Sequence, residues 1–333
     1  MKKTILSFVV AIVATTTTYA QNTLVATLSH GDDIQMFYGT YALRDAHNAA
    51  VSGDIINLSG GAFQAITITK GVTLRGTGID DIAPTYINGD LTINVASDDD
   101  NRLSMEGIRC TGKTTLKGTL NSPYFLKSMF YAIINPNSSD KIKNALFANC
   151  KIEGYYDLRG SSSVQFINSY VYGFNNSFTS STSSASFINC VIYPYYNGFN
   201  TSDIRCSQLL NCIICTTNGG NALPNSTMAT NCVAIGYNDL FSGNAANTKN
   251  STASFAEVFK NFTGTYSDEQ TFELTDEAKT KYLGNDGTEV GMYGGVLPYS
   301  STPSYPQITK MNVANKTTAD GKLSVEIEVS AAE

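Results

Sequence analysis

The sequence predicts an all-β fold: a single-stranded, right-handed parallel β-helix with rungs of about 20 residues, an N-terminal cap helix and a short C-terminal β tail. Two observations carry this prediction, the composition and an internal repeat. The 333-residue chain is rich in Gly, Tyr and Phe, contains no Trp, and is only 15% charged. Strands and turns favour such residues, whereas helical bundles draw on Ala, Glu, Lys and Leu. The net charge of -6 also argues against nucleic acid or an anionic membrane as a partner.

The internal repeat is the stronger of the two signals. An apolar residue, a turn residue two positions later and an apolar residue three positions beyond it recur five times, at steps of 19, 21, 22 and 20. The turn residues are Asn149, Asn168, Asn189, Asn211 and Asn231. Steps of 21 upstream place Ser128 and then Gly107 at the same position. A copy this short buries its apolar face only by stacking on its neighbours about 4.8 Å away, as in a solenoid.

The sequence lacks the signatures of other repeat folds with a similar period. The Leu-x-x-Leu-x-Leu pattern of leucine-rich repeats is missing, and no long helices repeat. In a parallel β-helix, the five Asn residues would form a structural turn ladder, because Asn tolerates the left-handed conformation and stacked amides can hydrogen-bond. Two apolar columns would fill the interior: Phe147, Phe166, Phe187 and Leu209 in one, and Ile152, Val171, Ile192, Ile214 and Ala234 in the other.

The seven cysteines follow the same register. Four of them share one repeat position, namely Cys150, Cys190, Cys212 and Cys232, and Ser169 takes that position in another rung. Stacked side chains lie about 4.8 Å apart, whereas disulfides bring the Cβ atoms to about 3.8 Å. The repeat therefore predicts buried free thiols that pack as small hydrophobic groups. Cys212 and Cys215 match the redox C-x-x-C motif in sequence but not in expected geometry, because residues three apart on a strand face opposite sides.

The chain divides into four segments. Residues 1–20 predict a secretory signal peptide, with a Lys pair, a short apolar run and a cleavage site ending at Ala20. Residues 21–295 would form the β-helix with its caps, residues 296–307 a Pro-containing linker, and residues 308–333 a short β-strand tail. No other segment reaches transmembrane length, so no membrane span is expected after signal cleavage.

Both ends of the β-helix segment resemble a known family. Residues 39–50 predict a short helix, which is followed by Gly53-Asp54-Ile-Ile, Gly-Gly-Ala-Phe63 and Leu-Arg-Gly76-Thr-Gly78. This opening resembles that of the pectin-lyase-like right-handed β-helix proteins, with Ala-Phe where Thr-Tyr is commoner. The glycine-rich residues 284–295 are similar to the closing segment of many such bacterial proteins. The resemblance implies the fold but no particular activity, because the superfamily includes lyases, polygalacturonases and adhesins.

Motifs that could carry chemistry are sparse. Residues 107–114 match the P-loop pattern, but no helix follows to hold a phosphate. A lyase would need a Lys or Arg base and often calcium, and a hydrolase would need two acids. No two acids share a repeat register with a basic partner in a way that matches a lyase site. The candidates are Glu106, Asp140, Glu153, Asp157, Asp203, Asp239, Lys141, Lys143, Lys151, Arg109, Arg159 and Arg205. Asp98, Asp99 and Asp100 could supply calcium ligands, although a solvated loop is the alternative.

Aromatic residues recur at fixed positions after the repeat Asn. The glycan-binding candidates are Tyr155, Tyr170, Tyr172, Phe174, Tyr193, Tyr195 and Tyr237. Aromatic faces at a constant rise form a platform for sugar rings or for another protein, and the alternative is stacking that seals the turns. The low charge of such a strip suits neutral glycans better than acidic ones.

These observations predict a secreted, periplasmic or cell-surface bacterial protein. The favoured hypothesis is a non-catalytic β-helix that binds a polysaccharide or a cell-surface protein along its aromatic flank. One alternative is a polysaccharide lyase or glycoside hydrolase of the pectin-lyase-like superfamily, and another is a purely structural surface protein. No cofactor is expected, and calcium would enter only if the protein were a lyase.

Overall fold

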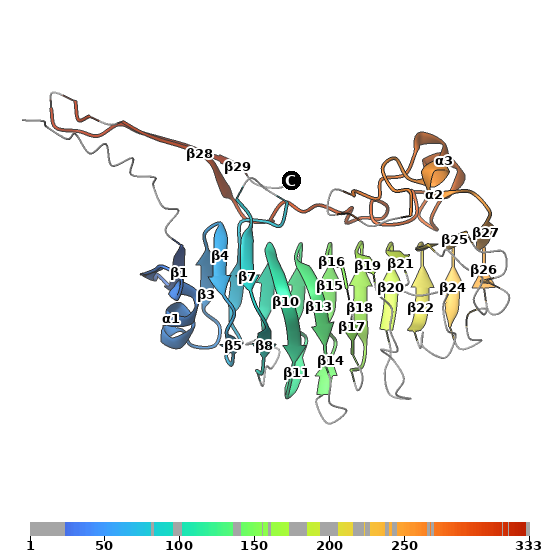
Figure 1. The fold of residues 1–333 in the computed structure, drawn as a ribbon, viewed down its shortest axis with the longest axis horizontal. Helices are drawn as coiled ribbons and strands as arrows, with labels where there is room; N and C mark the ends of the chain where they lie inside the picture. Colours follow the sequence, from blue (N-terminus) through green and yellow to red (C-terminus); the bar gives the residue numbers. More distant parts are fainter. Residues whose placement is uncertain are drawn as a thin grey trace, which may run out of the picture.

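The structure is a computed structural model of the 333-residue chain. It describes residues 24–80, 83–95, 102–135, 141–154, 156–158, 161–172, 185–193, 206–215, 223, 227–236, 240–241, 245–264, 267, 270–314, 316–318 and 320–330. Parallel strands stack into a solenoid, as the repeat predicts (Figure 1). The predicted signal peptide lies outside the described residues.

Two long sheets run along the solenoid. Sheet A contains β2 (Asp33–Tyr38), β1 (Val25–His30), β3 (Ile55–Leu58), β6 (Thr73–Arg75), β9 (Ser104–Glu106), β12 (Tyr124–Leu126), β15 (Leu146–Ala148), β18 (Val164–Ile167), β20 (Ala185–Ile188), β22 (Cys206–Leu210), β24 (Met228–Thr230) and β26 (Ala245–Ala246). Sheet B contains β4 (Gly61–Gln64), β7 (Thr85–Asn88), β10 (Ile108–Leu116), β13 (Met129–Ile134), β16 (Lys151–Ile152), β19 (Tyr170–Tyr172), β21 (Val191–Tyr193), β23 (Ile213–Cys215), β25 (Val233–Ile235) and β27 (Lys249–Ser251), with β5 (Thr67–Ile68), β8 (Leu91–Ile93) and β17 (Tyr156–Asp157) beside them. A short third sheet pairs β11 (Thr119–Asn121) with β14 (Lys141–Lys143).

From β9 onward, one residue in the left-handed conformation lies between each sheet A strand and the sheet B strand that follows it. The five repeat Asn residues have φ between 46° and 53°. Gly107 occupies the same position, with φ 66°. The rung between those of Gly107 and Asn149 differs from the prediction, because Phe125 pairs with Phe147 and so places Lys127, with φ 48°, at the turn instead of Ser128. The alignment of that rung was therefore wrong by one residue.

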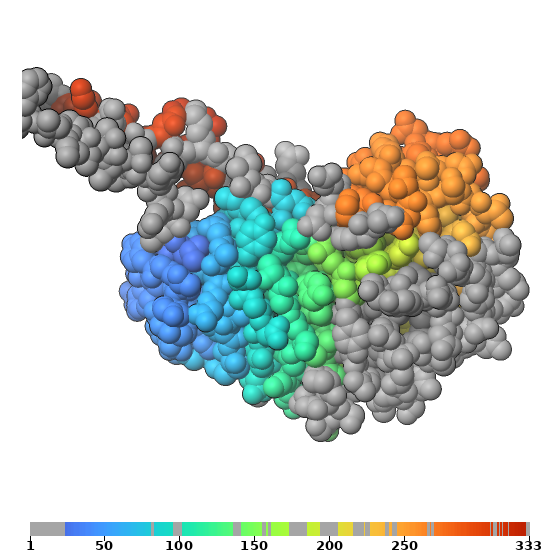
Figure 2. All heavy atoms as spheres, in the orientation of Figure 1, coloured from blue at the N-terminus to red at the C-terminus, as the bar shows by residue number. Residues whose placement is uncertain are grey.

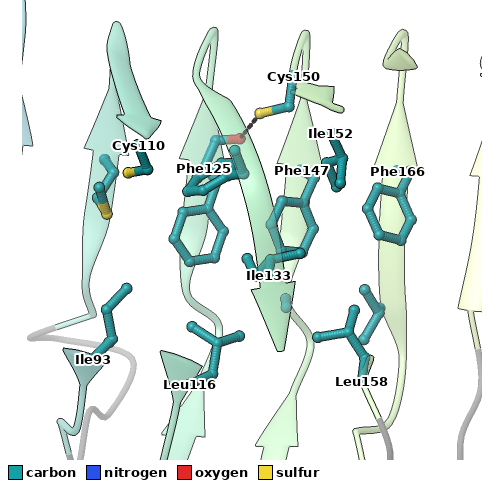
Figure 3. Packing of buried hydrophobic residues seen from close by; sticks show 14 of the residues in the cluster. Ile93, Cys110, Leu116, Phe125, Ile133, Phe147, Cys150, Ile152, Leu158 and Phe166 are labelled. Atoms are coloured by element: carbon teal, nitrogen blue, oxygen red, sulfur yellow. Dashed lines mark hydrogen bonds between the residues drawn. The ribbon is translucent and has the colours of Figure 1, made fainter. Parts of the chain in front are cut away.

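The interior columns predicted from the repeat are confirmed. Phe147, Phe166 and Phe187 pair in register, and their ring centroids lie 4.8 Å apart. Figure 3 shows the Phe125, Phe147 and Phe166 side chains inside the coil, each on its own rung. The rings stack because identical side chains in parallel strands recur at the strand spacing.

The cysteines are buried free thiols, as predicted. Each column thiol donates a weak hydrogen bond to the carbonyl two residues before it; the Cys150 Sγ lies 3.4 Å from the Ala148 oxygen. Ser128 and Ser169 occupy the same column and make the same bond at 2.9 Å and 2.8 Å. Burial raises the pKa of the Cys150 thiol to about 12, so the thiol stays protonated and unreactive. The column therefore satisfies carbonyls at the turn.

Both ends of the coil carry additional structure. At the N-terminal end, β1 and β2 form an antiparallel hairpin that extends sheet A, and α1 (Ala42–Ala49) packs beside it. The hairpin was not predicted. At the C-terminal end, the described residues between 253 and 294, here called the cover, include α2 (Phe255–Val258) and α3 (Asp276–Lys281). The cover sits on the last rungs (Figures 1 and 2).

Residues 295–305, here called the strap, run from the cover back toward the first rungs. Asn168 Nδ2 donates to the Met292 and Gly294 carbonyls at 2.8 Å and 2.7 Å, just before the strap begins. Along the strap, the Ser300 amide donates to Asn149 Oδ1 at 2.7 Å, and Lys127 Nζ donates to the Thr302 carbonyl at 2.6 Å. Tyr305 ends the strap, where its hydroxyl donates to the Gly76 carbonyl. The turn residues therefore bind the C-terminal chain more than one another.

Beyond the strap, β28 (Gln307–Val313) and β29 (Val325–Ser330) form an antiparallel hairpin. In the ladder itself, an amide-to-amide bond joins Asn211 Nδ2 to Asn189 Oδ1 at 3.2 Å. Asn211 also bonds Asn285 of the cover. The predicted linker is thus an extended segment that is bound along the coil.

Candidate functional site: the outer face of sheet B

Two columns of side chains point outward from sheet B, because residues alternate between the interior and the exterior of the coil. The first column contains Tyr86, Arg109, Met129, Lys151, Tyr170, Val191, Ile213 and Val233. The second column contains Tyr131, Glu153, Tyr172, Tyr193, Cys215 and Ile235. The chemistry of both columns changes along the coil, from polar and aromatic in the first rungs to apolar in the last.

The last rungs of this face lie under the cover. Tyr170 is fully buried, and its ring stacks on that of Phe272 with centroids 4.2 Å apart. The Tyr193 ring meets Phe262 edge-on at 5.6 Å, and its hydroxyl donates to the Gly264 carbonyl at 2.9 Å. Burial raises the pKa of Tyr170 well above its usual value.

The aromatic strip predicted as an open platform is therefore covered at its described positions. Tyr170 points away from the coil interior, but it has no exposed surface and cannot contact a ligand from solvent. Tyr172 stacks on Tyr193 at 5.4 Å, and both are half-buried against the cover. Apolar residues on the cover and on the rungs explain this outcome, because burying both surfaces together is favourable. The remaining candidates, Tyr155, Phe174, Tyr195 and Tyr237, lie outside the described residues.

The first rungs of the same face are not under the cover. Tyr131 belongs to the column of Tyr172 and Tyr193, yet it is 59% exposed. Nearby, the Arg109 guanidinium lies 5.9 Å from the centre of the Tyr86 ring, and its Nη2 lies 3.9 Å from Glu153 Oε2. Arg109 and Glu153 keep 22% and 12% of their side-chain surface exposed. The face here combines an exposed ring with a half-buried ion pair.

A second ion pair lies deeper, where the strap meets the sheet. Lys151 is only 6% exposed, and its Nζ lies 3.4 Å from Asp80 Oδ2 and 5.8 Å from the centre of the Tyr299 ring. Burial first, and then the nearby Asp80 carboxylate, raise the pKa of Tyr299 well above its usual value. The Tyr299 hydroxyl is buried and has no hydrogen-bond partner among the described residues. Two basic and two acidic side chains thus gather on this part of the face.

The sequence missed this grouping because of the register of one rung. With Ser128 at the turn, Tyr131 falls at an interior position, whereas Lys127 at the turn places it outside. Arg109 and Glu153 were both candidates, but they stand two rungs apart in different columns, and only the folded coil shows that they meet. Tyr86 and Asp80 were not singled out.

The other candidates named from the sequence are spread over the molecule. Residues 107–114 lie at a turn and in the strand β10, so no helix follows that could hold a phosphate. The imidazole of His30 contacts Asp54 at 2.7 Å, and His47 accepts a hydrogen bond from the Thr69 amide at 3.1 Å. Both belong to the N-terminal end. Asp98, Asp99 and Asp100, together with Asp140, Asp203, Asp239, Arg159 and Arg205, lie outside the described residues.

The described residues hold neither a metal cluster nor a membrane-spanning helix. They contain no group of three or more His, Cys, Asp or Glu side chains placed to hold a metal ion. In the same part of the chain, no helix has the length and apolar character needed to cross a bilayer.

Comparison with known protein families, with curated proteins and with solved structures found no match to this chain.

Proposed function

We propose that the protein is an exported, non-catalytic β-helix of the pectin-lyase-like type that binds polysaccharide on the outer face of its first sheet B rungs. The observation that carries the proposal is the exposed Tyr131 ring beside the Arg109–Glu153 pair. Aromatic rings stack on the apolar faces of sugars, and a fixed ion pair supplies donors and acceptors for hydroxyl groups. Secretion, to the periplasm or the cell surface, accompanies this proposal through the predicted signal peptide.

The charge of the site favours a neutral polysaccharide. Arg109 faces Glu153 and Lys151 faces Asp80, so each basic group has a carboxylate within 3.9 Å. A uronate would have to displace one of these carboxylates, and the net charge of -6 would repel a polyanion. Uncharged hydroxyls need no such displacement.

The test measures retention of the mature protein in gels that contain one neutral polysaccharide each. Tyr131→Ala should weaken binding to the retained glycan by about 5- to 30-fold, since one ring–sugar contact is worth roughly 1–2 kcal/mol. Tyr38→Ala is the matched control, because Tyr38 is 61% exposed on β2 at the end of sheet A. Equal retention of wild type and Tyr131→Ala would contradict the proposal.

A polysaccharide lyase is the second candidate, and the gathering of Lys151, Arg109, Asp80 and Glu153 favours it. In such a reaction a base removes the proton from the carbon beside a uronate carboxyl, the glycosidic C–O bond breaks, and the leaving oxygen takes up a proton. Incubation with a panel of uronate polysaccharides, with and without calcium, would reveal unsaturated products by their absorbance. Product formation that Arg109→Ala or Lys151→Ala abolishes would replace the binding proposal.

A further inference from the structure

The C-terminal hairpin separates apolar and polar residues onto two faces. The register of β28 and β29 pairs Ile308 with Val329, Met311 with Ile327, and Val313 with Val325. Directly paired residues share a face, so these three pairs make one apolar face. The pairs Lys310–Glu328 and Asn312–Glu326 occupy the other face. The Asn312 Nδ2 donates to Glu326 Oε2 at 2.9 Å, which confirms that the two side chains share that face.

The described part of the chain leaves the apolar face uncovered. Ile308, Val325, Ile327 and Val329 are 62%, 48%, 51% and 59% exposed. Among the described residues, β28 and β29 pair only with each other. Figure 1 shows the hairpin extending away from the coil at its N-terminal end. The strap ends at Tyr305, so the base of the hairpin is anchored two residues before β28 begins.

A hairpin of this kind is marginal by itself. Two strands without a packed face are barely stable in water, and an alternating apolar strand exposed to solvent invites association. A partner that covers the apolar face would therefore stabilise the hairpin and remove its exposed residues from water.

We propose that the apolar face of β28–β29 packs against the same face of a second copy of this chain, which makes the protein a two-fold symmetric dimer. The face is self-complementary, because its register positions are apolar on both strands and carry no charge. The charged residues Glu326 and Glu328 remain on the outer faces, so no like charges meet at the contact. Identical patches that contact each other close a two-fold dimer and leave no further patch for growth.

The size of the face sets the expected strength of the dimer. The four described apolar side chains expose roughly 400 Å² per copy, so a face-to-face contact would bury about 800 Å², which is below the roughly 1,200 Å² of standard interfaces and typical of a weak, reversible contact. Such a contact predicts a dissociation constant in the micromolar range, on the order of 1–100 μM.

The experiment is sedimentation velocity of the mature full chain across a concentration series that spans this range. Ile327→Lys places a charge in the centre of the apolar face and should weaken the dimer by about 100-fold or more. Ser330→Lys adds the same side chain on the opposite face and should change the dissociation constant by less than about threefold.

A second variant tests the contact without relying on a stable mutant hairpin. Ile327→Cys should form a disulfide-linked dimer under mild oxidation, whereas Ser330→Cys should not, because position 330 lies on the opposite face of the hairpin. The native cysteines are buried and do not compete for the new thiol. A chain that stays monomeric throughout the concentration series would overturn the proposal. So would a dimer that survives Ile327→Lys and is lost in Met36→Lys, because the contact would then involve the exposed residues of β2.

Discussion

The two halves of the outer face of sheet B have the same strand arrangement but differ in burial. In the last rungs, Val191, Ile213 and Ile235 face outward and are buried beneath the cover. In the first rungs, Arg109, Glu153 and Tyr131 occupy the same columns and lie outside it. Since the backbone repeats along the coil, the side chains alone decide which rungs become a second hydrophobic core. A repeat fold therefore sets the positions of a surface, and the residues placed there set its use.

The largest expected effect comes from opening the covered half. Phe262 is buried and touches Phe255, Phe259, Phe272 and Tyr193. Phe262→Ala should lower the free energy of unfolding by about 3–5 kcal/mol, through lost burial and the cavity that remains. Tyr131→Ala in the open half should change it by no more than about 0.5 kcal/mol. Urea denaturation of both variants checks the difference, and equal losses would mean that the two halves are not distinct.

The next effect concerns the turn residues that hold the cover and the strap in place. Asn168→Ala removes both bonds to the Met292 and Gly294 carbonyls and leaves Ala with φ near 46°. The expected loss of unfolding free energy is about 2–4 kcal/mol, from unpaired buried carbonyls and left-handed strain together.

Asn144→Ala is the matched control. Asn144 has φ 54° but is exposed, and its amide bonds Asn121. It should lose only about 1 kcal/mol. Similar losses in the two variants would show that the contacts of Asn168 with the C-terminal chain contribute little.

A smaller effect is expected where the strap begins. Gly295 has φ 77°, and a Cβ on it would lie 2.4 Å from Asn189 Nδ2. Gly287 has φ 78° with open space around it. Gly295→Ala should therefore cost about 2–3 kcal/mol and Gly287→Ala about 1 kcal/mol. Thermal unfolding of the two variants separates the effect of the contact with Asn189 from that of backbone strain. Identical melting temperatures would show that the contact with Asn189 does not contribute.

The smallest effect is a pH dependence within the cover. Burial raises the pKa of the Glu289 carboxyl above its ordinary value of 4.5, although Lys279 Nζ lies 3.6 Å away and opposes the shift. The folded protein then holds this proton more tightly than the unfolded chain, so stability falls as pH rises from about 4.5 through the folded pKa.

Glu289→Gln should remove that part of the slope, because Gln does not titrate. Unfolding free energies measured at pH steps between 4 and 7 give the comparison with wild type. A Glu289→Gln profile parallel to that of the wild type would contradict the prediction.

The repeat predicted the interior of the coil because interior positions obey one rule in every rung. Phe147, Phe166 and Phe187 all fill the same space, so their spacing reveals the column. The outer face obeys no such rule. Whether an outward Tyr is buried or open depends on residues a hundred positions away, as Phe272 on Tyr170 shows. The outward position of Tyr131 could not be predicted, because the repeat alignment placed Ser128 at the turn of that rung. Lys127 holds the turn instead, and Lys is unusual in the left-handed conformation.

The strap also constrains how this protein can change in length. Ten residues separate Gly295, which lies against Asn189, from Tyr305, which binds Gly76, and the same interval spans five steps between successive turns. On average the strap has two residues for each rung, although its contacts are unevenly spaced, since Asn149 binds Ser300 and Lys127 binds Thr302. Duplicating one rung would lengthen the coil by about 4.8 Å and leave the strap two residues short. Repeat proteins commonly evolve by gaining or losing units, but here each such event would require a matching insertion or deletion far downstream in the gene.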